Sequence, residues 1–224
     1  HPDIIDFIKA KSISETKLTN FNLSVLITNK FLTAVENDQP WDLKWGGRLY
    51  TSIRARLLYD LIIDGMYNKG EPGILFFDTI NQYNPMKEEF GDIITANPCG
   101  EQLLCVDSKT GGGESCNLGS ANLTKFIDGK KFKVADFMDV VRVGVVGLNR
   151  MLELNELPLK EIRDCTMKGR KIGFGIMGWA DMLVMAGIPY NSSESIGLIS
   201  VIGSAMKQEA VATSKMLAEQ YGPY

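Results

Sequence analysis

Residues 97–102 combine an amide, a thiol and a carboxylate at alternate positions, in Asn97, Cys99 and Glu101. In an extended or looped backbone, alternate side chains point to the same side, so all three can face one ligand. A thiol can supply a thiolate or a sulfur radical, a carboxylate can accept a proton, and an amide can hold a hydroxyl group. The segment therefore has the groups of a catalytic loop.

The residues between these three also favour a loop that approaches a ligand. Pro98 restricts the backbone conformation locally, and Gly100 allows another molecule to come close to the main chain. Residue types and spacing alone do not identify the reaction. An ordinary turn, with a buried Cys99 and a surface Glu101, fits the same pattern.

Four cysteines lie in the chain, three of them within 18 residues of one another: Cys99, Cys105, Cys116 and Cys165. They are too few for a disulfide scaffold in a chain of 224 residues. Zinc sites use paired cysteines or cysteine with histidine at tight spacing, whereas the single histidine here is His1. We therefore expect no metal site, and thiols that serve reactivity or packing.

The composition excludes several classes of protein. Hydrophobic residues make up 45%, which is enough for a folded core, and the net charge is −3, with 24 Lys and Arg against 27 Asp and Glu. A protein held to nucleic acid by charge would need an excess of basic residues. The sequence contains no apolar run of membrane-spanning length and no signal-peptide pattern at its start. We expect a soluble, cytoplasmic protein that binds neither nucleic acid nor membrane.

Both ends of the sequence suggest a piece of a longer polypeptide. The chain begins with His1 instead of methionine, and Pro2 followed by Ile4, Ile5 and Ile8 already has the pattern of a helix. We therefore expect a fragment, truncated at both ends.

Hydrophobic periodicity predicts helices alternating with strands. Helices are expected at 2–11, 28–37, 51–69, 134–153 and 179–187, with Gly70 as the C-cap of the third. A last helix is expected from its N-cap Asn191 onward, with Ile202 and Thr213 on its inner face. Strands are expected at 21–27, 73–78 and 171–178, with turns at 38–41 and 45–47. The alternation predicts an α/β fold with parallel strands in a single domain. Residues 84–120 form an irregular segment too long for a plain connection, and loops of that length are usually functional.

Several segments resemble the large chain of ribonucleotide reductases. Residues 97–102, followed by residues 115–123 with the sequence Ser-Cys-Asn-Leu-Gly-Ser-Ala-Asn-Leu, are similar to the catalytic core of that family. The Asn-Pro-Cys-Gly-Glu version is most like the adenosylcobalamin-dependent class. Residues 1–4, 20–25, 73–76 and 170–178 are similar to further family segments in the same order, so the resemblance covers essentially all 224 residues.

The resemblance implies roles for individual residues. Cys99 matches the cysteine that becomes a thiyl radical and removes the 3′ hydrogen of the ribose. Glu101 matches the carboxylate that takes the 3′-hydroxyl proton, and Asn97 matches the amide that holds the 2′-hydroxyl. Cys116 matches one cysteine of the pair that delivers two electrons and becomes a disulfide, and its partner would lie upstream of His1. The substrate would bind along residues 97–101, which include Pro98 and Gly100.

The same resemblance implies a fold, a cofactor and partners. The family fold is a ten-stranded α/β barrel with a central cysteine-bearing finger loop, and residues 1–224 would be the central portion of that barrel. Adenosylcobalamin would supply the radical, with a metal-containing partner subunit as the alternative source. The implied partners are a ribonucleotide substrate, a thioredoxin-like reductant and a second copy of the full-length parent. The isolated chain is expected to lack activity.

Two other functions stay open. A cysteine-nucleophile enzyme would need a histidine base near Cys99, and His1 is the only histidine. A non-catalytic binding or structural module could descend from the same family. We expect a catalytic Cys99 to sit on a loop tip surrounded by strands, with Asn97 and Glu101 on its side, whereas a surface position would favour the module.

The remaining glycines and cysteines are expected to have structural roles. The three glycines at 111–113 are read as a flexible connector, because no Lys-Ser or Lys-Thr pair follows them as in a phosphate-binding loop. Cys105 and Cys165 are expected to serve packing.

Overall fold

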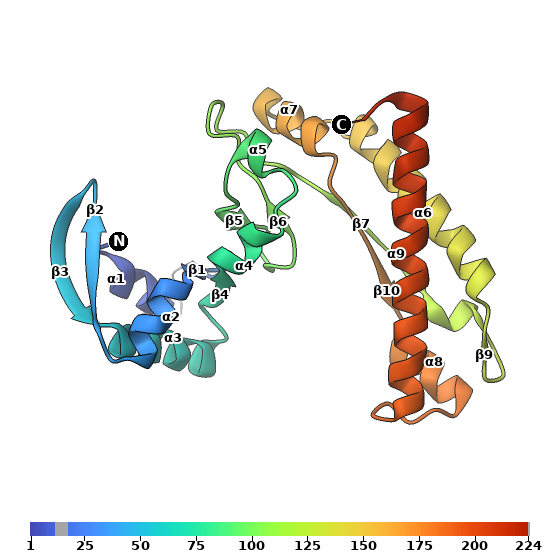
Figure 1. Cartoon of the computed structure of the whole chain (residues 1–224), viewed down its shortest axis with the longest axis horizontal. Coiled ribbons are helices and arrows are strands. Elements are labelled where there is room, and N and C mark those ends of the chain that lie inside the picture. The colour runs from blue at the N-terminus through green and yellow to red at the C-terminus, as the bar shows by residue number, and fades with distance from the viewer. Residues whose placement is uncertain (12–17, 224) are drawn as a thin grey trace. The chain divides into compact units, whose positions relative to one another are not determined.

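The computed structural model describes residues 1–11 and 18–223, and it divides into two compact units, His1–Lys109 and Thr110–Tyr224. Helices and strands alternate in both units (Figure 1). None of the helices among the described residues has the length and apolar character needed to cross a membrane.

The first unit contains six strands and five helices within its described part. In chain order they are α1 (Ile4–Lys9), β1 (Ser24–Ile27), α2 (Asn29–Glu36), β2 (Pro40–Trp45), β3 (Arg48–Arg54), α3 (Ala55–Lys69), β4 (Gly73–Phe76), α4 (Phe77–Gln82), α5 (Lys87–Phe90), β5 (Thr95–Ala96) and β6 (Leu103–Leu104).

The centre of the first unit is the parallel pair β1 and β4. Ser24 lies opposite Gly73 and Ile27 lies opposite Phe76. Helices α1, α2 and α3 contribute buried side chains to the same hydrophobic core as β1. The side chain of Thr28 caps α2 by accepting a hydrogen bond from the backbone N–H of Phe31, at 3.2 Å. A short buried strand followed at once by a capped helix is the α/β pattern that the sequence predicts.

The hairpin of β2 and β3 corrects the prediction for residues 38–54. The predicted turn at 38–41 is confirmed at Asp38, which has positive φ, but Pro40 and Trp41 belong to β2. The predicted start of a helix at residue 51 is wrong, because Pro40–Trp45 and Arg48–Arg54 pair as antiparallel strands. The turn at Gly46 and Gly47 is confirmed, and both residues have positive φ. Helix α3 consequently begins at Ala55, and it ends at the predicted cap Gly70, which is left-handed with φ 74°.

The second unit contains four strands and four α-helices among its described residues, together with one short 3₁₀ helix. In chain order they are β7 (Asn117–Asn122), η1 (Leu123–Lys125), β8 (Ile127–Asp128), β9 (Lys131–Phe132), α6 (Val134–Leu154), α7 (Lys160–Gly169), β10 (Ile172–Met177), α8 (Trp179–Ala186) and α9 (Ser193–Tyr221).

The second unit is built on the parallel pair β7 and β10, with helices α6 and α9 packed together beside it (Figure 1). The core at this pair includes Phe137 of α6, which is fully buried and lies edge-on to the rings of Phe126 and Phe132. Close packing of α6 on β10 depends on Gly144, where an added Cβ would lie 2.2 Å from the ring of Phe174. Strand β10 confirms the predicted strand at 171–178.

The last helix begins one residue later than its predicted cap. Ser192, not Asn191, is the N-cap, and its Oγ accepts a hydrogen bond from the backbone N–H of Ser195 at 3.1 Å. The predicted inner face is confirmed at Ile202, which is fully buried, and at Thr213.

The parallel pairs of both units confirm the α/β class. Within the described residues the strands form five two-stranded sheets and do not close a barrel. The placement of residues 1–224 as the central portion of a larger barrel stays a prediction.

Candidate active site

The predicted catalytic segment is the connection of a small hairpin in the first unit. Thr95 and Ala96 of β5 pair with Leu104 and Leu103 of β6. The backbone N–H of Asn97 donates to the carbonyl of Gln102 at 3.1 Å, which continues the pairing beyond the strands. Residues 97–102 are therefore held as a closed loop.

A tight turn at the start of this loop places Cys99 at its tip. The backbone N–H of Gly100 donates to the carbonyl of Asn97 at 3.0 Å. Asparagine first, proline second and glycine fourth is the preferred sequence of a common β-turn, because proline fixes φ and asparagine stabilises the turn start. Gly100 has φ 81°, a conformation that favours glycine.

The side chain of Asn97 connects the two ends of the loop. Its Oδ1 accepts a hydrogen bond from the backbone N–H of Gln102 at 2.9 Å, and its Nδ2 donates to Oε1 of Glu101 at 2.6 Å. The structure thus brings the side chains of Asn97 and Glu101 together, whereas the orientation of Cys99 toward the same side stays a prediction. An amide that donates a hydrogen bond to a carboxylate orients it.

The expected enclosure of Cys99 is not found within the described residues. Cys99 and Glu101 are both exposed, and β5 and β6 pair only with each other in that part of the chain. By itself the loop can present a thiol next to an oriented carboxylate, but its own strands do not shield the thiol from solvent.

Cys116 lies in the second unit, directly before β7, and is partly buried. The residue before it, Ser115, is anchored to α7 by Thr166, whose side chain is 1% exposed. The backbone N–H of Ser115 donates to Oγ1 of Thr166 at 2.9 Å, and the two hydroxyl oxygens lie 3.0 Å apart. The segment that carries Cys116 is therefore fixed to a helix.

A second anchor of the same segment is a buried ion pair that the sequence did not predict. The Glu114 side chain is fully buried, and its Oε2 lies 2.6 Å from Nζ of Lys171, at the start of β10. Gly169 makes room for this carboxylate, because a Cβ there would lie 1.8 Å from Oε1 of Glu114. Together with Thr166, this pair sets the position of Cys116 relative to α7 and β10.

The glycine run at 111–113 is more than a flexible connector. Gly112 is buried, and a Cβ at this position would lie 2.3 Å from the backbone carbonyl oxygen of Glu161. The glycine is needed for a close backbone approach to the first turn of α7, which corrects the prediction for this residue.

The other two cysteines are buried, as expected for packing: Cys105 in the first unit and Cys165 in α7. Cys99 and Cys116 belong to different units. The resemblance to the family implies that Cys116 lies close enough to Cys99 for electron delivery in one pocket, and this stays a prediction.

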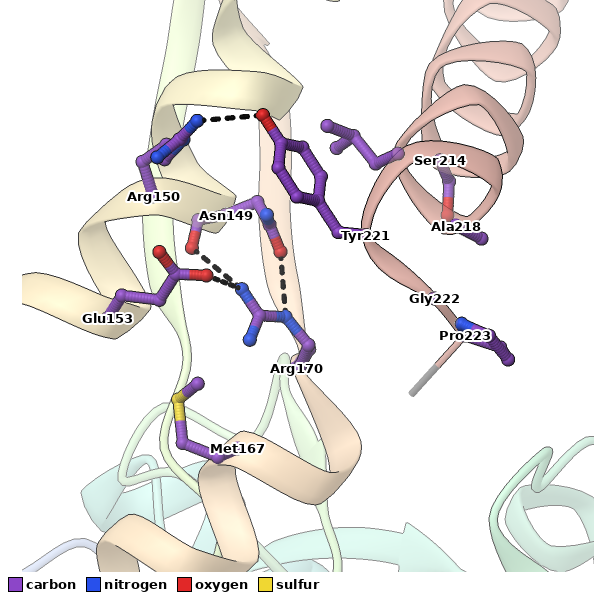
Figure 2. A pocket seen from close by; sticks show the side chains of 11 residues that line it. Asn149, Arg150, Glu153, Met167, Arg170, Ser214, Ala218, Tyr221, Gly222 and Pro223 are labelled. Carbon is purple, nitrogen blue, oxygen red and sulfur yellow. Dashed lines mark hydrogen bonds and ion pairs between the residues drawn. The ribbon is translucent and has the colours of Figure 1, made fainter.

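A cavity of about 280 Å³ in the second unit is lined by none of the predicted site residues. Figure 2 shows Arg170 reaching Oδ1 of Asn149 at 3.0 Å and Oε1 of Glu153 at 2.7 Å. Arg150 donates to the hydroxyl of Tyr221 at 2.9 Å. These bonds connect α6 with the C-cap of α7 and with the end of α9.

A comparison with known families identifies the family of this chain. A family model described as "Ribonucleotide reductase, barrel domain" matches residues 1–224. The chain belongs to the ribonucleotide reductase family. This membership favours the predicted roles of residues 97–101 over a cysteine-nucleophile enzyme, which would need a different set of partners.

Several reductases of known type are similar in sequence to this chain over its whole length. A vitamin B12-dependent ribonucleoside-diphosphate reductase of Thermoplasma acidophilum is 39% identical over 227 residues, and one of Mycobacterium tuberculosis is 37% identical over 226. The ribonucleoside-diphosphate reductase large subunit of Monkeypox virus is 29% identical over 251 residues. Each comparison covers 100% of this chain, but only 29%, 32% and 32% of the respective relative.

Proposed function

We propose that the full-length protein containing this chain reduces ribonucleotides to 2′-deoxyribonucleotides by radical chemistry at Cys99. The observation that carries the proposal is the hydrogen bond from Asn97 to Glu101, 2.6 Å long, in the loop that presents Cys99. A catalytic thiol next to an oriented carboxylate is what the chemistry needs, and the loop lies in a chain that matches the family over its whole length.

Each residue of the site has its own role in the proposed reaction. A Cys99 thiyl radical takes the 3′ hydrogen of the ribose, so that an S–H bond forms and the C3′–H bond breaks. Glu101 accepts the proton of the 3′-hydroxyl, which promotes departure of the 2′-hydroxyl as water. Asn97 exchanges its present partner for the 2′-hydroxyl of the substrate. The thiols of Cys116 and a second cysteine supply two electrons and two protons as they are oxidised to a disulfide, so that one proton leaves with the 2′-hydroxyl as water and a hydrogen is added at C2′. Cys99 then returns its hydrogen atom to C3′, which restores the thiyl radical.

Adenosylcobalamin is the radical source in this proposal, because the Thermoplasma acidophilum and Mycobacterium tuberculosis relatives bear the name vitamin B12-dependent reductase. The thiol of Cys99 is exposed, so such a group could reach it. When bound, adenosylcobalamin is a source of radical chemistry. A metal-containing partner subunit is the alternative source.

The proposal extends to partners that restore the enzyme after each turnover. The disulfide formed by Cys116 must be reduced, and a thioredoxin-like protein in a reducing cytoplasm is the proposed reductant. A homodimer of the full-length protein completes the proposed assembly.

Substitutions in the full-length protein test this function. Cys99→Ser should abolish deoxyribonucleotide formation, since an O–H bond is too strong for the hydroxyl to give a usable radical. Glu101→Gln should slow the reaction severely by removing the proton acceptor. Cys105→Ser is the matched control, because it makes the same change at a buried cysteine outside the proposed chemistry. Near-full turnover by Cys99→Ser would end the proposal.

A non-catalytic module is the second candidate, and the exposure of Cys99 and Glu101 in the described chain favours it. An assay for product formation distinguishes the two candidate functions. A module would bind a ribonucleotide without converting it, even when supplied with adenosylcobalamin and a dithiol reductant. An active reductase would form the deoxyribonucleotide under the same conditions.

A further inference from the structure

The segment before β1 makes a long-range contact with the turn that carries Cys99. Nδ2 of Asn22 donates a hydrogen bond to the carbonyl oxygen of Pro98 at 2.8 Å, across 76 residues of sequence. That carbonyl belongs to the peptide group joining Pro98 to Cys99. The bond therefore holds the main chain immediately before the thiol-bearing residue.

The same turn lies near the neighbouring strand. A Cβ added at Gly100 would lie 3.9 Å from Cδ2 of Leu75, which belongs to β4. Asn22, just before β1, therefore bonds the loop, and Leu75 of β4 lies close to it. Since β1 and β4 pair along their whole length, both neighbours belong to one element.

That element is a stable reference for the position of the loop. Val25 and Ile27 of β1 are buried in the core of the first unit. Leu23 extends the pairing beyond the strand, because its carbonyl accepts a hydrogen bond from the backbone N–H of Gly73 at 2.8 Å. Asn22 is the next residue outward, so its side chain projects from a firmly held segment.

The loop's own hydrogen bonds fix its shape but not its direction. The bonds from Gly100 to Asn97 and from Asn97 to Gln102 all lie within residues 97–102. A hairpin of two-residue strands can tilt as a body while these bonds persist. The bond from Asn22 opposes such a tilt, because it links the turn to the β1–β4 pair.

We propose that Asn22 is a positioning residue that fixes the direction of the Cys99 turn through the Pro98 carbonyl. The inference rests on the proposed function of Cys99. Transfer of a hydrogen atom to sulfur requires close approach of the two atoms. A misplacement of about 1 Å can cost on the order of 100-fold in rate even when the substrate still binds.

Two variants and one matched control separate this role from general stability. Asn22→Ala removes the side chain, and Asn22→Asp keeps its size but replaces the donor with a carboxylate that only accepts. Asn68→Ala is the control, because Asn68 in α3 is also exposed and its Nδ2 donates to the Asp64 carbonyl, likewise at 2.8 Å. All three are made in the full-length protein.

Amide exchange and steady-state kinetics are measured on the same preparations. In both Asn22 variants the Gly100 amide should exchange about 3- to 10-fold faster, the range expected for the loss of one supporting hydrogen bond. We expect kcat for ribonucleotide reduction to fall about tenfold or more, and KM to change by less than about twofold. Asn68→Ala should match the unsubstituted protein in both measurements. The alkylation rate of Cys99, followed by mass spectrometry of its peptide, should change only in the Asn22 variants.

The outcomes distinguish failure of this inference from failure of the proposed function. One contrary result is that Asn22→Asp matches Asn68→Ala in amide exchange, in Cys99 alkylation and in kcat, while Cys99→Ser is inactive. That result would overturn the role of Asn22 and leave the proposed function of Cys99 standing. A rise in KM with kcat unchanged would also overturn it, because Asn22 would then act in binding. Turnover by Cys99→Ser would instead remove the proposed function. Should Asn22→Ala fail to fold, Asn22→Asp still decides the question, since it keeps the shape of the side chain.

Discussion

Gly169→Ala should destabilise the second unit by displacing a buried carboxylate. The new Cβ would lie 1.8 Å from Oε1 of Glu114 and 2.9 Å from its Cδ, closer than non-bonded atoms can approach. Glu114 cannot move into solvent without loss, because its side chain is fully buried and its other oxygen lies 2.6 Å from Nζ of Lys171. The substitution therefore breaks the ion pair that anchors the segment before Cys116.

The size of the effect follows from two opposing contributions. Breaking a buried ion pair by displacing one partner costs about 3–5 kcal/mol, and Lys171, with a 19% exposed side chain, belongs to that class. Alanine in place of glycine stabilises a helix by about 1 kcal/mol at most. Gly169 is the last residue of α7, so this stabilisation is smaller than in a helix interior. We expect a net loss of about 2–4 kcal/mol.

Urea unfolding of the 224-residue chain with Trp41 and Trp45 replaced by Phe, followed by the fluorescence of Trp179 in the second unit, measures this loss. Gly147→Ala is the matched control, because Gly147 lies inside α6 and nothing lies within 4 Å of its added Cβ. It should raise stability by up to about 1 kcal/mol. In a Glu114→Ala background, Gly169→Ala should no longer destabilise. If Gly169→Ala alone is as stable as Gly147→Ala, the reasoning about Glu114 is refuted.

Two further predictions concern Thr166 and Asp42. Thr166→Val should cost about 1–3 kcal/mol in urea unfolding, because it leaves the partly buried N–H of Ser115 without its acceptor; no change in stability would contradict this. Lys44, and then Ser52, hold the pKa of Asp42 below its ordinary value of 3.8 through hydrogen bonds to the carboxylate. The stabilisation by Asp42 is therefore present above pH 3.8 and is lost as the pH falls through the lower folded-state pKa. The difference in melting temperature between the unsubstituted chain and Asp42→Asn should shrink in that range, and a difference that persists at lower pH would contradict the assignment.

The elements with strong periodicity could be predicted from the sequence, and the others depend on their partners. Helices α3 and α6 carry clear apolar faces, and the Gly70 cap follows from its place after such a face. Strand β7 consists of Asn, Leu, Gly, Ser and Ala, which have little strand preference between them. It is a strand because it pairs with β10, which a local pattern cannot reveal.

The candidate site likewise has a part that could be predicted from the sequence and a part that could not. Asn97, Cys99 and Glu101 lie within five residues, so their grouping could be predicted from spacing alone. The supporting contacts join distant segments, as Asn22 joins Pro98 and as Glu114 joins Lys171. Such contacts depend on tertiary structure. The exposure of Cys99 was not expected, because the prediction assumed enclosing strands that the described residues do not form.

The most direct test of the central claim uses a ribonucleotide deuterated at C3′ with the full-length protein, its radical source and a dithiol reductant. If Cys99 removes the 3′ hydrogen, product should form more slowly from the deuterated substrate than from the unlabelled one, and Cys99→Ser should form no product from either. Product formation by Cys99→Ser, at a rate independent of deuterium at C3′, would contradict the claim.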